Sequence, residues 1–408
     1  MRMEHAPWFG LERTDKTMLE NRWDRPSGKA VYVQVPFCPE RCDYCAIPVT
    51  VSEGLLPDYL DALDYEIKRV RTAFRDESPV SVYIGGGSPT SIPQGSLDRL
   101  IALLAPFLEG AKEVTFESRP EALSDEILER LSQIGPGLRL SLGMEAIDGV
   151  SLQALGRHSP VQDPITRLSS LRQKTQASIS MDFIITGDEF DLESFLGICR
   201  DLKASGLDHL SIYPLVIEEK TVLSLRKSQG KTKVDLEERA AENWRRCCDG
   251  LCAEGWVRYE VSNFARSDRD GCRHNIHVWR GGEFLGLGPG AHQTCGNVRS
   301  ENVRSILEYV RLSRGENRHP FAAREILSDK EVYYERLYTN LRLNTGLPLR
   351  WMRTGSDQES VRTMLDEIVR NGYGTVDRTN EEVLVLSGEG LHLLDSIAER
   401  LLSCSEDP

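Results

Sequence analysis

Between residues 30 and 215, the apolar positions of the chain alternate between two periods. Short runs rich in β-branched residues predict strands, and the stretches between them repeat apolar residues every three or four positions, which predicts amphipathic helices. The expected strands are Val31–Val35, Val80–Ile84, Glu113–Glu117, Leu138–Leu142, Ile179–Ile184 and His209–Tyr213, and the expected helices are Pro57–Phe74, Gln94–Leu108, Ser124–Leu131 and Leu192–Leu202.

Strands that alternate with helices imply parallel pairing through right-handed crossovers. Six such strands predict an α/β fold in which the sheet curls into a TIM-like barrel or part of one, a partial (β/α)6 TIM-like barrel, with its reactive groups at the carboxyl ends of the strands. A run of cysteines follows the first strand, three glycines follow the second, Glu117 ends the third, and Asp182 lies in the fifth. These polar features are therefore expected on one rim.

The pattern changes towards the C-terminus. A long amphipathic helix is expected over Leu236–Ala253 and a strand over Trp256–Val261. Further on, three helices and two short strands predict an α+β module that resembles a winged helix, namely 330–343, 358–370, 374–376, 383–386 and 389–402. The expected division is an N-terminal extension (1–29), a partial barrel (30–255), a connecting region (256–321) and a C-terminal winged-helix-like domain (322–408).

Charge and composition exclude several classes of protein. The 408 residues include 50 Lys and Arg against 63 Asp and Glu, a formal net charge of −13, which argues against broad nucleic-acid binding. No apolar run is long enough for a membrane span, although peripheral association stays open. The first residues lack the apolar segment of a signal peptide, so we expect a cytoplasmic protein with reduced thiols.

Cys38, Cys42 and Cys45 form the run C-x3-C-x2-C directly after the first expected strand. Three thiolates can hold three irons of a [4Fe–4S] cluster and leave the fourth iron open to a small molecule. The alternative is structural zinc, which prefers four ligands in two pairs. The other cysteines offer no matching pair, and Cys247 and Cys248 look like apolar residues of a helix. The spacing therefore favours an iron–sulfur cluster.

The segment Gly85-Gly-Gly-Ser-Pro-Thr90 follows the second expected strand. Glycines let a ligand approach the backbone, whose exposed amides can bind a carboxylate or the end of an ammonium-bearing group. The segment lacks the Lys-Ser/Thr pair of a P-loop. In isolation, a tight turn without ligand is an equal alternative.

Taken together, these motifs resemble those of the radical S-adenosylmethionine (SAM) enzymes. The resemblance rests on the cysteine run, the glycine segment, Glu117 in Phe-Glu-Ser-Arg-Pro, and Leu140-Ser-Leu-Gly143. Within that superfamily the chain resembles the oxygen-independent coproporphyrinogen III oxidase family, most closely its haem-chaperone (HemW-type) branch. Further matching segments are Leu155–His158, Leu210–Tyr213, Tyr259–Phe264, Arg273–Gly282 and Leu285–His292.

The resemblance implies a role for particular residues. The three cysteines would hold the cluster, Tyr44 would lie beside the adenine of SAM, Gly86 and Gly87 beside its methionine part, and Glu117 beside its ribose or ammonium end. The full set of implied SAM-binding residues is Tyr32, Tyr44, Gly86, Gly87, Ser88, Glu117, Glu145, Arg157 and Asp182. A donor such as flavodoxin or ferredoxin would reduce the cluster, which would cleave SAM into methionine and a 5′-deoxyadenosyl radical. No catalytic group beyond the cluster and SAM is implied.

Some positions depart from the family pattern. Glu145 stands where the family usually has glutamine, Gln34 where many members have histidine, and Ile47 where the oxidase branch has a further cysteine. These departures keep three functions open. The first is a haem-chaperone-like protein, the second is a class C methyltransferase that uses a second SAM molecule, and the third is the decarboxylating oxidase. The substrate would be a small molecule or haem, and the first function is the one we favour.

The expected haem or substrate residues are His274, Asn275, Trp279 and His292. A structural role for His274, with its ring nitrogens bonded to the glycine-rich loop that Cys272 and Cys295 flank, is an equal alternative. If the stretch around His274 and His277 is extended, the two rings point to opposite faces and a shared metal is not expected.

Overall fold

The computed structural model describes residues 26–74, 77–159, 161–187, 190–231, 236–314, 319–352, 358–377 and 382–404. Most of the N-terminal extension expected over residues 1–29 therefore lies outside the described residues. The six expected parallel strands are present and adjacent in the expected order. They are β1 (Lys29–Val35), β2 (Ser81–Gly86), β3 (Val114–Ser118), β4 (Leu138–Glu145), β5 (Ser178–Ile185) and β6 (His209–Pro214).

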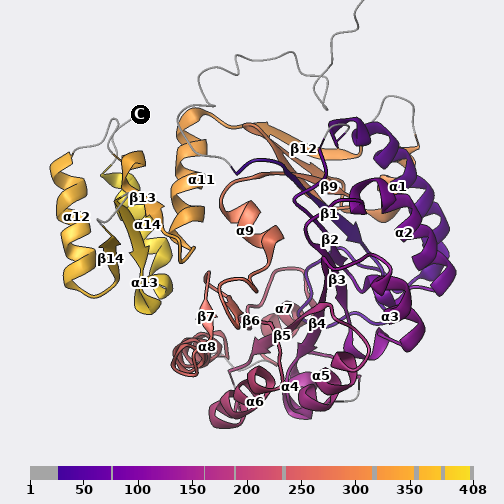
Figure 1. The fold of residues 1–408 in the computed structure, drawn as a ribbon, viewed down its shortest axis with the longest axis horizontal. Coiled ribbons are helices and arrows are strands. Elements are labelled where there is room, and N and C mark those ends of the chain that lie inside the picture. The colour runs from indigo at the N-terminus through magenta and orange to yellow at the C-terminus, as the bar shows by residue number, and fades with distance from the viewer. Residues whose placement is uncertain are drawn as a thin grey trace, which may run out of the picture.

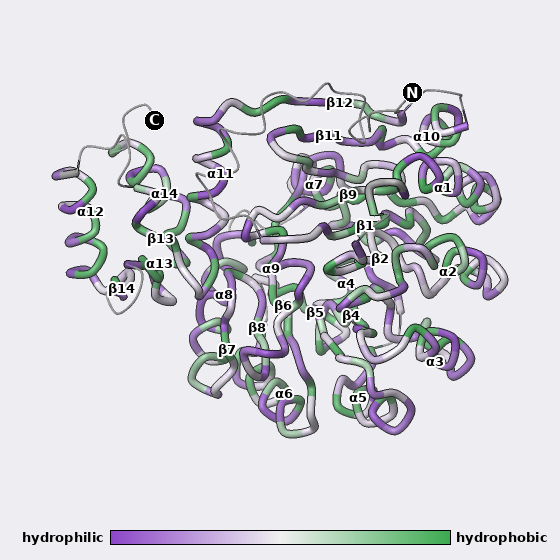
Figure 2. Tube along the Cα trace, turned by 45° about the horizontal axis from the view of Figure 1, so that its top comes forward, coloured by the Kyte–Doolittle hydropathy of each residue, from purple (hydrophilic) through white to green (hydrophobic). Residues whose placement is uncertain are grey.

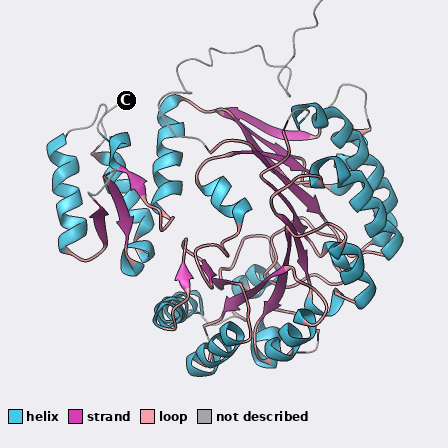
Figure 3. Cartoon of the chain, in the orientation of Figure 1, coloured by secondary structure: helices cyan, strands magenta, loops and turns pink. Residues whose placement is uncertain are grey.

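Helices cover the outer face of this curved sheet, which stays open as a partial barrel (Figures 1 and 3). The fold class predicted from the sequence is thus confirmed. Along α1 and α2, polar and apolar residues alternate within each turn (Figure 2), so that one face of each helix is buried. The helices of this part are α1 (Leu56–Val70), α2 (Gln94–Leu108), α3 (Asp125–Ser132), α4 (Gly149–Ala154), α5 (Pro164–Arg172), α6 (Leu192–Ala204), α7 (Val222–Ser228) and α8 (Leu236–Ala253).

The sheet is larger than expected, because twelve strands belong to it. Beside β1, β9 (Glu283–Leu287) runs parallel, and β10 (His292–Cys295), β11 (Val298–Asn302) and β12 (Phe321–Ile326) follow antiparallel. Beyond β6 lie β8 (Asn263–Ala265) and β7 (Val257–Arg258). The single strand expected over Trp256–Val261 is therefore wrong in extent, since two short strands flank a turn there.

The segment around His274 is a helix, α9 (Arg273–Trp279), and the premise of an extended chain is wrong. Three residues span about one helical turn, so His274 and His277 start from neighbouring positions on one side of α9. Their rings nevertheless bond different partners. His274 Nδ1 lies 3.0 Å from Ser81 Oγ, and His277 Nε2 lies 3.0 Å from the Glu283 carbonyl oxygen. Each ring is thus fixed by its own contact.

The C-terminal part has an apolar core of its own, built around Leu337, Leu341, Leu384 and Leu401. Three antiparallel strands in the order β13-β15-β14 pack against helices (Figure 1). These elements are α11 (Asp329–Leu341), β13 (Leu347–Pro348), α12 (Gln358–Arg370), β14 (Gly374–Asp377), β15 (Val383–Leu386), α13 (Gly388–His392) and α14 (Leu394–Ser403).

Arg342 makes two of the contacts that join this part to the barrel. Arg342 donates to Glu260 at 2.7 Å, and its guanidinium lies 3.7 Å from the ring centre of Trp279 in α9. Helix α10 (Ile306–Ser313) packs on α1, and five short 3₁₀ helices complete the fold at Glu53–Leu55, Arg71–Phe74, Pro89–Ser91, Pro120–Ala122 and Leu349–Met352. Within the described ranges, every helix is too short or too polar to cross a membrane.

Candidate functional site

A cavity of about 580 Å³ opens at the carboxyl ends of the central strands. It gathers nearly all the residues expected to hold the cluster and SAM, which are Cys38, Cys42, Tyr44, Cys45, Gly86, Gly87, Ser88, Glu117, Glu145, Arg157 and Asp182. Tyr32 is the exception, because its hydroxyl donates to Gln34 Oε1 at 2.6 Å and its side chain does not line the cavity.

The cysteine loop connects β1 to α1 and is held by backbone hydrogen bonds at Cys38 and between Cys42 and Cys45. Cys38 N donates to the Thr50 carbonyl at 3.0 Å, and Asp43 N donates to the Leu155 carbonyl at 3.0 Å. Burial, together with the nearby thiols of Cys45 and Cys42, raises the pKa of the Cys38 thiol to about 12. The three thiols are therefore close enough to influence one another.

Among the described residues, no three His, Cys, Asp or Glu side chains converge on one point where a single metal ion would bind. A cluster makes a different demand, since each of the three thiolates binds a different iron. Three neighbouring thiols on one wall of a cavity fit that demand and do not fit a closed four-ligand zinc site.

Glu117 is tied to the glycine segment. Gly86 N donates to Glu117 Oε2 at 2.9 Å, and Tyr83 Oη donates to Oε1 at 2.8 Å. Gly86 has a φ of +94°, and a Cβ there would lie 2.3 Å from the Gln34 amide, so this position requires glycine. Burial raises the pKa of Glu117 to about 7 despite these two hydrogen bonds.

Glu145 lies at an irregularity in the pairing of β4 and β5 and has a φ of +65°. A non-glycine residue in this region costs roughly 1–3 kcal/mol of backbone strain. The conformation places Glu145 Oε1 2.7 Å from Arg157 Nη1. Burial raises the pKa of Glu145, and Arg157 opposes that rise.

Asp182 completes a set of three carboxylates with Glu117 and Glu145. It accepts hydrogen bonds from Ser141 Oγ at 2.8 Å and Ser180 Oγ at 3.1 Å. Asp182 and Glu145 both contribute to the raised pKa of Glu117, so the three groups repel one another in the same cavity. A ligand that carries positive charge, as SAM does on its sulfonium and ammonium groups, would relieve this repulsion.

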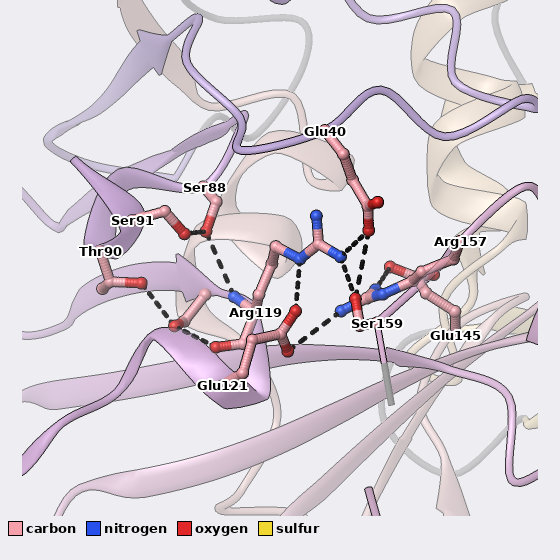
Figure 4. Close-up of polar contacts among 10 residues, drawn as sticks. Glu40, Ser88, Thr90, Ser91, Arg119, Glu121, Glu145, Arg157 and Ser159 are labelled. Atoms are coloured by element: carbon pink, nitrogen blue, oxygen red, sulfur yellow. Dashed lines mark hydrogen bonds and ion pairs between the residues drawn. The ribbon is translucent and has the colours of Figure 1, made fainter. Parts of the chain in front are cut away.

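A network of ion pairs beside the cysteine loop was not expected from the sequence (Figure 4). Arg119 donates to Glu40 and Ser159, and its Nε donates to Glu121 Oε1 at 2.8 Å. Glu121 Oε2 lies 3.6 Å from Arg157, which also contacts Glu145. Because Glu40 lies between Cys38 and Cys42, this network links the cysteine loop to the far wall of the cavity.

The four expected haem or substrate residues do not gather in one place. Asn275 lines the cavity. His274 is buried and its Nδ1 is bonded to Ser81, and Trp279 lies against Arg342. The side chain of His292 is 66% exposed and lies 3.8 Å from Glu301.

Comparison with known proteins decides the family. The Radical SAM superfamily profile matches residues 32–202. The heme chaperone HemW of Mycobacterium tuberculosis is 30% identical over 381 residues, which cover 91% of this chain and 94% of the relative. The chain belongs to the radical SAM superfamily, in its HemW branch. The heme chaperone HemW of Bacillus subtilis is 28% identical over 328 residues, 78% of this chain and 84% of the relative.

Among solved structures, coproporphyrinogen III oxidase (HemN) from Escherichia coli shares the fold of this radical SAM enzyme. The TM-score is 0.74 at 20% identity, over 93% of this chain and 91% of the other. Membership of the radical SAM superfamily implies a [4Fe–4S] cluster and SAM. The neighbouring thiols and the carboxylate-rich cavity fit both groups.

Proposed function

We propose that this radical SAM enzyme binds haem beside its SAM cavity, as a haem-chaperone-like protein. The observation that carries the proposal is the extent of the match to the heme chaperone HemW of M. tuberculosis, which covers 91% of this chain. The match continues far beyond the superfamily segment at 32–202, into the connecting region and the C-terminal part.

The mouth of the cavity supports an apolar ligand. Ile47 and Val216 line the mouth, with 42% and 53% of their surfaces exposed. Exposed apolar side chains that gather at a cavity commonly mark a binding surface. A flat porphyrin ring would cover them, with the apolar face of the ring against the side chains.

His292 is the iron ligand that we propose, in preference to His274. The exposed imidazole of His292 is accessible, whereas His274 is buried and already bonded to Ser81. The turn before His292 also lies against the cysteine loop, because Gly290 approaches Pro48 so closely that a Cβ would lie 2.8 Å from its Cγ. Haem on His292 would therefore sit near the cluster.

The proposed cofactor roles follow the geometry of the cavity. Cys38, Cys42 and Cys45 would hold the cluster, which when reduced supplies an electron to SAM through its open iron. The cavity-lining residues Tyr44, Gly86, Gly87, Ser88, Glu117, Glu145, Arg157 and Asp182 would bind SAM, while Tyr32 would act indirectly by orienting Gln34. The electron donor would be a protein such as flavodoxin or ferredoxin.

A haemin titration of the anaerobically reconstituted protein tests the haem proposal. We expect saturable binding by the wild type, a changed Soret band and at least about tenfold weaker binding in His292→Ala, and nearly unchanged binding in His274→Ala. No binding by the wild type, or equal binding by wild type and His292→Ala, would contradict it. In the same preparations, Cys42→Ala is expected to abolish 5′-deoxyadenosine formation from SAM.

A further inference from the structure

Successive side chains of strand β4 point alternately to the helix-covered outer face of the sheet and to the cavity inside the barrel. Leu138, Leu140 and Leu142 belong to the core between sheet and helices, whereas Arg139 and Ser141 line the cavity. This is the alternation of a strand with one apolar and one polar face. Arg139 therefore points into the barrel, six positions before Glu145, which corresponds to roughly 20 Å of strand. One strand thus lines both the rim and the interior of the cavity.

Arg139 is buried, with 3% of its surface exposed, and its Nε has no hydrogen-bond partner. Within the described ranges, no carboxylate lies at ion-pair distance from its guanidinium. The other buried arginines of the cavity differ. Arg119 is paired with Glu40 and Glu121, and Arg157 with Glu145 and Glu121. Arg139 is thus a buried cation that lines a ligand cavity without a direct counter-ion.

Glu113, the carboxylate near Arg139, and the cavity carboxylates Asp182 and Glu117 are all bonded to other groups. Glu113 accepts from the backbone N–H groups of Arg273 and His274, both at 3.0 Å, at the start of α9. Asp182 accepts from two serines, and Glu117 from Tyr83 and Gly86. Burial disfavours the charge of Arg139, but the proximity of Cys272 and Glu113 raises its pKa. The guanidinium is therefore held charged at a distance from its nearest acidic groups.

We infer that Arg139 is an anion subsite that takes the carboxylate of a ligand bound in the barrel. An arginine presents its N–H donors as a planar fork that matches a carboxylate in two parallel hydrogen bonds. A buried charge is costly unless it is paired and hydrogen-bonded, and a bound carboxylate would supply both. Asn275 also lines the cavity, so its side-chain amide is a second polar group available to a ligand there.

The subsite requires that the cavity bind a ligand, as proposed above, but it does not require that the ligand be haem. The carboxylate has two sources with the same chemistry, a propionate side chain of a tetrapyrrole or a small free carboxylate. Two arms of one experiment distinguish them. The first arm uses sodium propionate, with neutral propionamide as its control. The second compares haemin with haemin dimethyl ester, in which both propionates are masked.

In the first arm, the melting temperature of the full-length protein is measured with ligand on the order of 100 mM. We expect propionate to raise it by about 2 °C in the wild type, because a ligand that binds the folded state stabilises it, and propionamide to have no effect. Arg139→Gln should lose the response. Arg258→Gln removes another buried arginine, which bonds the Val261 carbonyl and does not line the cavity, and should respond like the wild type.

In the second arm, the wild type should bind the dimethyl ester about tenfold or more weakly than haemin, and Arg139→Gln should bind both alike. If the wild type binds haemin and the dimethyl ester equally well, and its propionate response depends on Arg139, the subsite takes a small carboxylate. A propionate response that is the same with and without Arg139 overturns the subsite.

If haemin does not bind at all, the haem proposal fails and the propionate arm alone decides the subsite. Should Arg139→Gln not fold, Arg139→Lys keeps the charge near Glu113 but loses the planar fork. Its propionate response must then be smaller than that of the wild type, and an equal response overturns the inference.

Discussion

Arg119 and Glu121 lie at the rim of the barrel, whereas Arg139 and Glu117 line its interior, and only the first two form an ion pair. Arg119 Nε lies 2.8 Å from Glu121, and although burial acts to raise the pKa of Glu121, its backbone hydrogen bond and Arg119 hold that pKa below its usual value. In the interior, burial raises the pKa of Glu117 to about 7, and Arg139 Nε has no hydrogen bond.

The comparison distinguishes charged side chains that pair with one another and hold the site together from charged side chains that are available to a ligand. At the rim, Arg119 is paired with carboxylates of the protein itself, and one of these pairs holds Glu40 of the cysteine loop in place (Figure 4). In the interior, Glu117 and Asp182 accept hydrogen bonds from neutral hydroxyl groups, Glu145 is paired with Arg157, and Arg139 Nε has no hydrogen-bond partner. We therefore expect rim substitutions to act mainly on stability and cluster loading, and interior substitutions to act mainly on ligands and on pH dependence.

The largest effect should follow from Arg119→Gln. It leaves Glu40 and Glu121 without their shared cation. Breaking a fully buried ion pair costs about 3–5 kcal/mol, and because the two carboxylates keep 28% and 34% of their side chains exposed, we expect no more than the lower end of that range, about 3 kcal/mol. The free energy of unfolding from denaturant titration should fall accordingly, and the iron content per chain after reconstitution should fall because the cysteine loop loses an anchor.

The matched control for this change is Arg200→Gln, which breaks the exposed pair with Glu254 on the outer surface. An exposed pair contributes only about 0–1 kcal/mol. If Arg119→Gln costs no more than Arg200→Gln, the rim network does not hold the loop and the distinction between rim and interior is lost.

The features that the sequence predicts well are those with local signals. The cysteine loop and the glycine segment come at the ends of strands and Glu117 lies near the end of its strand, and carboxyl ends of parallel strands meet at the same end of a barrel, so their convergence on one cavity could be predicted. Arg119 and Glu40 are 79 positions apart, and no local pattern announces their pairing. Arg139 did leave a signal, since it is a charged residue on the polar face of the alternating strand Leu138-Arg-Leu-Ser-Leu142.

The rest of the fold escaped prediction for similar reasons. Strands β9 to β12 are short or exposed at the edge of the sheet, so they lack the continuous apolar runs of the central strands. Helix α9 has seven residues, too few for a clear period, and its start is fixed by Glu113, which is distant in sequence and directly precedes β3. The secondary structure of β9 to β12 and of α9 therefore depends on tertiary contacts, which a local sequence pattern does not reveal.

A second prediction concerns the pH dependence of stability. The pKa of Glu117 rises from 4.5 in the unfolded chain to about 7 in the fold, so its contribution is fully present below pH 4.5 and is lost as pH rises through 7. Relative to Glu117→Gln, the wild type without SAM should lose about 3 kcal/mol across this window. Denaturant titrations at several pH values measure the difference, and parallel curves for the two proteins would contradict the interior assignment.

The smallest expected effect comes from Glu145→Gln, which introduces the glutamine that the family resemblance leads us to expect at this position. Glutamine removes a buried charge that is costly to keep, but it also weakens the bond to Arg157, which retains Glu121 at 3.6 Å. These changes oppose each other, so the stability should change by no more than about 1 kcal/mol.

Binding of SAM should be more sensitive than stability in Glu145→Gln, because the cavity loses one of the three carboxylates that favour a cation. We expect the affinity to fall on the order of fivefold, equivalent to about 1 kcal/mol. Equilibrium dialysis with SAM measures this directly. If SAM binds the variant as tightly as the wild type while stability falls, then Glu145 belongs with Arg119 among the residues that build the rim, and the boundary between the two regions lies deeper in the barrel.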